Sequence, residues 1–366
     1  RLGRDWRSWP GKQRGGSLGT ADIAQDEERF HLVAQVEVRR QLTGLREHLD
    51  DVGVDLGLDL AVGVHPDGYD AWSRPGLFAD GMAVGAPPDA GFPSVQSWGF
   101  PPVLPQSSRA EGHAYIAASV AHQAALAGVL RVDHIMAMSR LYWIPAGMDL
   151  ACGTYVGYPT EELFAVLCLE SHRNTCELVG EDLGTVPPEI DEALPRHGIW
   201  SMYLAEFEAR TSGSLAPPSG AQAAMINTHD TPTFAGWMDA VDIDERVRVG
   251  LLNPSEAPAA RAARLEATRA LANAMGGDSD NPEELLALVL SWLGASASPL
   301  VVVWLEDLWL ETEPVNIPGS TSAQRPNWRR PMKLLLEQVK ADPTVARHLA
   351  LLDSARKGAG VRSSET

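Results

Sequence analysis

Three carboxylates in this sequence each stand at the end of a short apolar segment of the kind that forms a buried strand. They are Asp133 after residues 129–132, Glu181 after residues 176–180 and Asp230 after residues 223–227. The intervals between these acids are long enough to hold one strand and one helix each. Because barrel enzymes assemble their chemistry from the carboxyl ends of different strands, the three acids are candidates for one catalytic site.

The alternation of predicted strands and helices indicates an α/β fold. Strand-like segments lie at about residues 56–64, 129–135, 176–180, 199–204, 223–227 and 300–305. Helical patterns lie at about residues 23–51, 109–127, 159–173, 257–274, 282–291 and 330–340. A doubly wound nucleotide-binding sheet usually carries a glycine-rich phosphate loop, and neither GxGxxG nor GxxxxGKS/T occurs. We therefore predict a (β/α)8 TIM barrel with loop insertions, whose long Pro- and Gly-rich loops surround the mouth of the site.

Charge and cysteine content argue against several classes of partner and site. The formal net charge is −18, whereas nucleic acids and anionic membranes are bound by clustered Lys and Arg. No apolar run approaches the roughly 18 residues that a membrane span needs. The three cysteines are odd in number and lack CxxC spacing, so we expect no disulfide framework, no zinc site and a cytoplasmic location.

Asp133 and Glu181 have the surroundings that a retaining glycosidase mechanism requires. That mechanism uses a nucleophilic carboxylate and a protonated acid about 5–5.5 Å apart. Arg131 precedes Asp133 on the same side of a strand, and its positive charge would keep Asp133 ionised as the nucleophile. Glu181 follows an apolar strand, which suits an acid/base with a raised pKa. Taken alone, each residue also fits a structural role, as a strand-end ion pair or as an acid at a helix start.

His229 and Asp230 end a third strand, because Pro232 follows and cannot continue a ladder. An aspartate at this place can accept hydrogen bonds from two sugar hydroxyls. A His-Asp metal site is the alternative, but no HxH or HExxH segment accompanies the pair, so we expect no metal and no cofactor. Asp67 and Asp70 follow the first predicted strand, and they also fit a turn, where Asp beside Gly is common.

Taken in chain order, these residues resemble the four short regions shared by the α-amylase clan of retaining barrel enzymes. More narrowly, the chain resembles the amylomaltases, the family of 4-α-glucanotransferases or disproportionating enzymes. The narrower resemblance rests on segments 59–64 (DLAVGV), 85–89 (GAPPD), 96–99 (QSWG), 141–145 (LYWIP), 179–187 (VGEDLGTVP), 306–308 (EDL), 315–319 (VNIPG) and 326–330 (PNWRR). These segments are spread over nearly the whole chain.

What the resemblance implies for catalysis agrees with the assignment from the residues. It implies Asp133 as nucleophile, Glu181 as acid/base and Asp230 as the residue that stabilises the transition state. It implies substrate-binding roles for a further set: Arg131, His134, His229, Asp67, Asp89, Gln96 and Trp98. The implied reaction moves an α-1,4-glucan segment to the 4-hydroxyl of an acceptor, with retention, through a covalent β-glucosyl intermediate on the nucleophile. The implied partners are α-1,4-glucans and maltooligosaccharides.

Some features depart from the family pattern. Val95 stands where a Gly is usual and Tyr142 where a Trp is common, which affects the geometry of the acceptor site. The opening strands of the family, with their Trp-Gln-x-Leu-Pro and Ser-Pro-Tyr segments, are absent, and the chain opens on Arg1. We therefore expect an N-terminally truncated fragment with an incomplete barrel of about strands 3 to 8. The expected plan is a catalytic part at 1–356, inserted loops at about 80–108 and 236–296, and a polar tail at 357–366.

Other functions stay open at this point. An α-glucan hydrolase would use the same acids, with water in place of the sugar acceptor. A non-catalytic glucan-binding or structural remnant would result if the missing strands prevent a working site, and the open sheet edge would then favour aggregation. A metal-dependent phosphoester hydrolase is the most distant of these alternatives.

Overall fold

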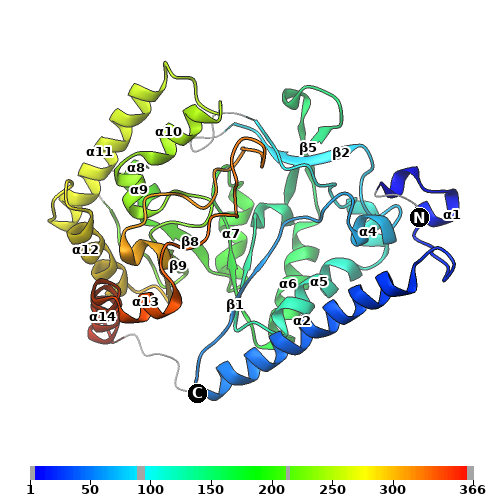
Figure 1. The fold of residues 1–366 in the computed structure, drawn as a ribbon, viewed down its shortest axis with the longest axis horizontal. Helices are drawn as coiled ribbons and strands as arrows, with labels where there is room; N and C mark the ends of the chain where they lie inside the picture. The colour runs from blue at the N-terminus through cyan, green and yellow to red at the C-terminus, as the bar shows by residue number, and fades with distance from the viewer. Residues whose placement is uncertain (1–4, 89–94, 212–214, 361–366) are drawn as a thin grey trace. The chain divides into compact units, whose positions relative to one another are not determined.

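A computed structural model of the protein describes residues 5–88, 95–211 and 215–360. The chain forms two compact units, Arg1–Trp200 (unit 1) and Ser201–Thr366 (unit 2), drawn as a ribbon in Figure 1. Each unit combines a parallel sheet with helices, and each is described by itself. Asp133 and Glu181 belong to unit 1, and Asp230 belongs to unit 2.

A three-stranded parallel sheet lies at the centre of unit 1. Its strands, in the order β1-β4-β7, are β1 (Gly57–Leu60), β4 (Val129–Val132) and β7 (Glu177–Gly180), so the first three predicted strands are confirmed. The register sets Asp59 of β1 beside Arg131 of β4. Because parallel strands end at the same edge, Asp133 and Glu181 both follow their strands at the carboxyl edge of this sheet.

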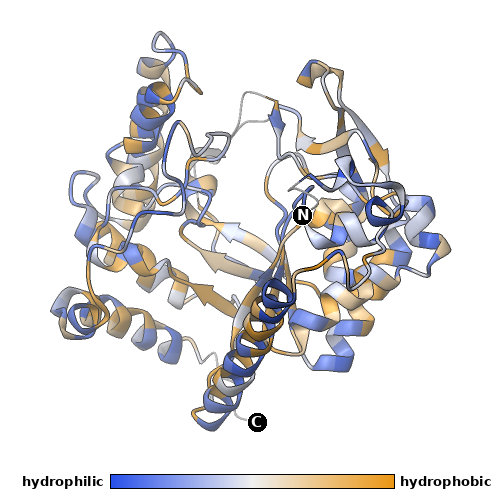
Figure 2. Ribbon diagram, turned by 45° about the vertical axis from the view of Figure 1, so that its right-hand side comes forward, coloured by the Kyte–Doolittle hydropathy of each residue, from blue (hydrophilic) through white to orange (hydrophobic). Residues whose placement is uncertain are grey.

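Apolar side chains from these strands and from three helices form the core of unit 1. The helices are α5 (Ala114–Ala124), α6 (Thr160–Asn174) and α7 (Pro188–Arg196). Leu130, Phe164 and Ile190 are fully buried in this core. Burying a side chain of this size contributes roughly 1.5–3 kcal/mol. Figure 2, coloured by hydropathy, shows hydrophobic segments among the strands of the molecule. On β4 and β7 the buried residues Leu130, Val132 and Leu178 lie close to the acids that follow these strands.

Unit 1 also contains an antiparallel sheet that the sequence patterns did not predict. Its order is β3-β2-β5-β6, with β2 (Met82–Ala86), β3 (Gln96–Ser97), β5 (Arg140–Pro145) and β6 (Thr154–Gly157). Gly85 is required where β2 passes β3, because a Cβ at this position would lie 2.0 Å from the backbone oxygen of Gln96. β2 and β3 lie within the region expected as an inserted loop at 80–108, where frequent Gly and Pro residues conceal the short strands.

A second parallel sheet lies in unit 2, with the order β10-β9-β8. Its strands are β8 (Ser201–Leu204), β9 (Gln222–Met225) and β10 (Leu300–Val302), which confirms the other three predicted strands. The helices are α8 (Ala205–Thr211), α9 (Phe234–Met238), α10 (Val241–Arg248), α11 (Ala257–Met275), α12 (Pro282–Gly294), α13 (Leu336–Ala341) and α14 (Pro343–Gly358). Phe234, Trp237 and Leu290 are fully buried between them. The domain plan of a catalytic part at 1–356 with an insertion at 236–296 stays a prediction.

The helix predicted at residues 109–127 is divided in two. α4 (Pro105–Ala110) ends before Glu111, and α5 begins at Ala114. Gly112 and His113 lie between them with φ of 64° and 56°, values that an α-helix does not accommodate. The buried ring of His113 bonds Ser108 at 2.8 Å, and this contact holds the residue in its left-handed conformation.

The long helix α2 (Gln25–Asp51) differs from α5, α6 and α7, because none of its residues is buried. Exposed apolar side chains along it include Phe30, Val33 and Val36. The remaining elements of unit 1 are α1 (Gly11–Arg14), α3 (Tyr69–Ser73), η1 (Trp6–Ser8), η2 (Ile135–Met138) and η3 (Leu150–Cys152), and unit 2 adds η4 (Leu305–Trp309). In the described part of the chain, no helix combines the length and apolar character that crossing a bilayer requires.

Candidate active site

Backbone hydrogen bonds bring Glu181 onto the segment that carries Asp133. The N–H of Glu181 donates to the Val132 carbonyl at 3.0 Å, and the N–H of Ile135 donates to the Glu181 carbonyl at 2.9 Å. The Glu181 side chain accepts a hydrogen bond at Oε2 from the backbone N–H of His134, at 2.7 Å. The residues immediately before and after Asp133 therefore hold Glu181. The structure brings together the two acids predicted as nucleophile and acid/base.

The surroundings of the Glu181 carboxyl favour its protonated form. The residue is 7% exposed, and burial raises its pKa to about 7, an effect that the charge of Asp133 reinforces. Arg131 and the backbone N–H groups of Leu183 and His134 lower the pKa but do not offset burial. Because this pKa lies above the ordinary value of 4.5, the protonated Glu181 carboxyl contributes its full share to the stability of the fold below pH 4.5. That stability is lost as the pH rises through about 7.

Arg131 joins Asp133 to a second carboxylate that the sequence patterns did not single out. Its Nη1 lies 3.1 Å from Asp133 Oδ1 and 2.8 Å from both oxygens of Asp59, so the side chains of Arg131 in β4 and of Asp133 just after it point the same way. Burial lowers the pKa of the guanidinium, but Asp59, Asp133 and Glu181 raise it above its ordinary value. The alternation of sides along β1 and β4 is the signal that could have identified Asp59.

His134 packs against Trp98 next to these acids. Burial lowers the pKa of His134 to about 4, so the ring is neutral at pH 7. The Trp98 ring meets it edge-on at 5.0 Å and stacks on Phe100 at 5.9 Å. The indole N–H of Trp98 donates to Gln96 Oε1 at 3.4 Å. The structure thus gathers three predicted substrate-binding residues, His134, Trp98 and Gln96, and supplies an aromatic surface of the kind that stacks on sugars.

Two other predicted substrate-binding residues are not placed in this group. Asp67 is exposed and forms an ion pair with Arg7, whose Nη1 lies 2.8 Å from Asp67 Oδ1. The N–H of Gly68 donates to the His65 carbonyl at 2.9 Å, so Asp67 sits in a turn, as its alternative interpretation requires. Asp89 lies outside the described residues.

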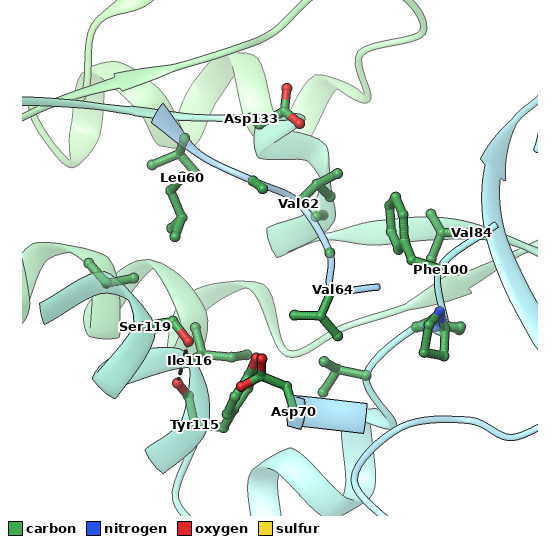
Figure 3. Close-up of a pocket in the computed structure, with 18 of the residues that line it drawn as sticks. Leu60, Val62, Val64, Asp70, Val84, Phe100, Tyr115, Ile116, Ser119 and Asp133 are labelled. Carbon is green, nitrogen blue, oxygen red and sulfur yellow. Dashed lines mark hydrogen bonds between the residues drawn. The ribbon is translucent and has the colours of Figure 1, made fainter. Parts of the chain in front are cut away.

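A cavity of about 760 Å³ in unit 1 reaches Asp133. Figure 3 shows Asp133 at one end of this cavity and Asp70 with Tyr115 at the other. The side chains between them are mostly apolar and include Val64 and Phe100. Burial, together with the charge of Asp70, raises the pKa of Tyr115 to about 12, so its phenol stays neutral. A mainly apolar space with a few polar groups is typical of a small-molecule pocket.

In unit 2, the third acid contacts His229 and Asn316. His229 Nε2 lies 3.2 Å from Asp230 Oδ2, and the Asn316 side-chain amide donates to Asp230 Oδ1 at 2.8 Å. Trp328 and Trp304 flank the His229 ring, with centroid distances of 5.6 and 6.5 Å. Asn316 received no role from the sequence patterns, since a neutral side chain in a loop carries no chemical signature of its own.

Asp307 is a third residue that the sequence patterns did not single out, although it belongs to segment 306–308. Its side chain is completely buried, and burial raises its pKa to about 7. Oδ2 accepts from the Asn227 side-chain amide, and Oδ1 accepts from the Phe234 N–H, both at 2.7 Å. Asn227 and Phe234 lie on either side of His229 and Asp230 in sequence. Asp307 therefore fixes both ends of the segment that carries these two residues.

Replacing Asp307 with Ala should lower the free energy of unfolding by about 2–4 kcal/mol, because two buried donors lose their acceptor. Urea unfolding followed by fluorescence measures the change. As a matched control, Asp353→Ala removes an exposed aspartate of α14 and should change the unfolding free energy by less than about 0.5 kcal/mol. Equal unfolding midpoints for the wild type and Asp307→Ala would contradict this assignment.

The described part of the chain holds no group of three or more His, Cys, Asp or Glu side chains able to bind a metal ion. The pair considered as an alternative metal site, His229 and Asp230, contacts Asn316 and the two tryptophans.

Relatives of known structure share this fold. An amylomaltase from Corynebacterium glutamicum superposes with a TM-score of 0.80 at 28% identity. The superposition covers 92% of this chain and 52% of the amylomaltase chain. An amylomaltase from Streptococcus agalactiae, solved in complex with acarbose, covers 97% of this chain and 68% of its own with a TM-score of 0.77 at 20% identity. Both structures confirm the α/β class of fold expected from the sequence.

Curated relatives and a family model agree with these structures. A 4-alpha-glucanotransferase of Mycobacterium tuberculosis (strain ATCC 25618 / H37Rv) is 36% identical over 94% of this chain and 51% of its own length. A 4-alpha-glucanotransferase of Haemophilus influenzae is 33% identical over 89% of this chain and 48% of its own length. The chain thus spans about half the length of the curated relatives it matches. Residues 2–337 match the model of glycoside hydrolase family 77, described as 4-alpha-glucanotransferase, and the chain belongs to this family.

Proposed function

We propose that this chain acts as a 4-α-glucanotransferase on α-1,4-glucans and maltooligosaccharides. The observation that carries the proposal is the arrangement of Glu181. Its carboxyl has a pKa of about 7 and is bonded to the backbone N–H of the residue that follows Asp133. A protonated acid beside an aspartate that is paired with Arg131 is the combination that retaining glycosyl transfer requires.

The reaction proceeds in two balanced steps. In the first, an oxygen of Asp133 attacks the anomeric carbon of the donor, and the glycosidic bond breaks. Glu181 gives its proton to the leaving oxygen, which departs as the 4-hydroxyl of the released glucan. In the second, ionised Glu181 takes the proton from the 4-hydroxyl of an acceptor, whose oxygen attacks the same carbon and displaces Asp133. Two inversions give net retention, and the number of glycosidic bonds is unchanged.

The remaining site residues have binding roles in this proposal. Asp230 accepts hydrogen bonds from sugar hydroxyls and stabilises the transition state, with His229 beside it. In unit 1 the stacked Trp98 and the neutral ring of His134 contact the sugar, and Arg131 keeps Asp133 ionised. Further contacts to the glucan are assigned to Gln96, Asp67 and Asp89. A cytoplasmic location belongs to the same proposal.

Incubation of the full chain with maltotriose tests this function. Transfer should yield glucose together with longer maltodextrins, while the total number of reducing ends stays constant. A rise in reducing ends would show hydrolysis instead, because water then replaces the sugar acceptor. A maltotriose mixture that the wild type leaves unchanged would contradict the proposal.

A further inference from the structure

We infer that Asn316 is a positioning residue that fixes the orientation of the Asp230 carboxylate through its side-chain amide. The inference rests on the proposed function, in which Asp230 stabilises the transition state. It concerns unit 2 alone, and it gives a role to the neutral side chain that donates to Asp230.

The two oxygens of Asp230 are held by different partners. Oδ1 accepts from Asn316 Nδ2 at 2.8 Å, and Oδ2 lies 3.2 Å from His229 Nε2. Contacts at both oxygens restrict the rotation of the carboxylate plane about the Cβ–Cγ bond. Asp230 is 43% exposed on its side chain, so it needs such contacts to keep one orientation in water.

Asn316 is itself held in place from both sides. The carbonyl of Val315 accepts from the Trp328 N–H at 3.1 Å and from Arg325 Nη1 at 3.3 Å. The N–H of Ile317 donates to Asn327 Oδ1 at 3.2 Å. The residues immediately before and after Asn316 are thus tied to the segment 325–328. Since Asn316 is only 9% exposed, its side chain reaches Asp230 from a fixed backbone.

Arg325 anchors this loop to the rest of unit 2. Its guanidinium is 4% exposed and bonds the Pro314 carbonyl, Asn327 Oδ1 at 3.1 Å and Glu245 Oε2 of α10 at 2.9 Å. A buried guanidinium with several fixed acceptors orders a segment that has no regular secondary structure. The loop that presents Asn316 is therefore part of the rigid structure.

The amide chemistry of Asn316 suits this role. An amide N–H donates to a carboxylate without adding a positive charge, so it leaves the negative charge of Asp230 available to other groups. A carboxylate has about four acceptor positions. Asn316 and His229 each contact a different oxygen of Asp230.

Two substitutions separate a donor role from a space-filling role. Asn316→Ala removes the hydrogen bond, and Asn316→Asp keeps the shape but sets one carboxylate against another. If the amide positions Asp230, kcat on maltotriose should fall roughly 10- to 100-fold in Asn316→Ala and further in Asn316→Asp. The Michaelis constant should change much less than kcat, because the lost alignment matters in the transition state. If Asn316 only fills space, the isosteric Asp should be better than Ala.

A matched control is available at Asn281. This residue caps α12, and its amide also donates to a carboxylate, that of Glu284 at 3.2 Å. Asn and Asp cap helices about equally well, so Asn281→Asp should keep wild-type kcat and stability. A melt of each variant shows whether it folds. If Asn316→Ala loosens the loop, Asn316→Asp is the variant to compare with the wild type, because Asp has nearly the same shape as Asn.

Crystal structures of the wild type and of Asn316→Ala test the inference without any assay of activity. The Asp230 carboxylate should turn in the variant, while the backbone of residues 227–233 stays in place. An unchanged Asp230 rotamer in Asn316→Ala would overturn the inference, and so would a kcat within twofold of the wild type. If the wild type itself leaves maltotriose unchanged, the proposed function fails, and the crystal structures alone decide the role of Asn316.

Discussion

Asp133→Asn should abolish glucan transfer, with a fall in kcat of about three orders of magnitude or more. An amide does not attack the anomeric carbon under these conditions, so no glycosyl intermediate forms. The fold should persist, because Arg131 keeps both hydrogen bonds to Asp59 when Asp133 loses its charge. Product formation from maltotriose, followed by chromatography, measures the change.

Two comparisons make the Asp133→Asn result specific. Asp149→Asn is a matched control, because this exposed aspartate caps η3 and Asn caps equally well. It should transfer glucose units at the wild-type rate. α-Maltotriosyl fluoride, whose leaving group needs no proton, should not rescue Asp133→Asn. Transfer from maltotriose by Asp133→Asn above about 1% of the wild-type rate would refute the nucleophile assignment.

Glu181→Gln should lower transfer from maltotriose by about two to four orders of magnitude, because Gln gives no proton to the leaving oxygen and takes none from the acceptor. With α-maltotriosyl fluoride the first step should survive and the second should be blocked. A covalent glycosyl adduct on Asp133 should therefore accumulate. Intact-protein mass spectrometry detects this adduct, which neither the wild type nor Asp133→Asn should build up.

The pH dependence of the wild type provides a second measurement of Glu181. Since the acid must be protonated to act and its pKa is about 7, kcat/KM on maltotriose should fall about tenfold per pH unit above pH 7. With the fluoride donor, formation of the adduct should not show this alkaline fall. Glu192→Gln, at an exposed position of α7, serves as the control and should keep the wild-type profile. An alkaline limb that persists in Glu181→Gln would assign the titration to another group.

The parts of the fold that follow a strong local pattern could be predicted from the sequence. β4 and β7 are short apolar strands, each followed directly by an acid, and this pattern alone identifies Asp133 and Glu181 as candidates. The antiparallel sheet of β2, β3, β5 and β6 could not be predicted in this way. Its strands are short, they contain Gly and Pro, and their pairing depends on residues far apart in the chain.

The missed site residues share a physical cause. Asp59 lies beside Arg131 only because β1 and β4 pair in one register, and a register is a tertiary property. Asn316 reaches Asp230 only because buried Arg325 folds its loop, and nothing in the sequence near Asn316 records that contact. Local patterns therefore identify the acids and Arg131, while the contacts of Asp59 and Asn316 depend on how distant segments pair.

The largely exposed surface of α2 has a consequence for how the molecule unfolds. No residue of this 27-residue helix is buried, so its turns depend mainly on local propensity, on ion pairs within the helix and on the bond from Arg46 to the Leu126 carbonyl at 3.3 Å. Such a segment exchanges its amide protons at a free energy well below that of the global transition. Helical content measured by spectroscopy should therefore fall in two stages. The first stage is the unfolding of α2, and the second is the cooperative unfolding of the buried helices.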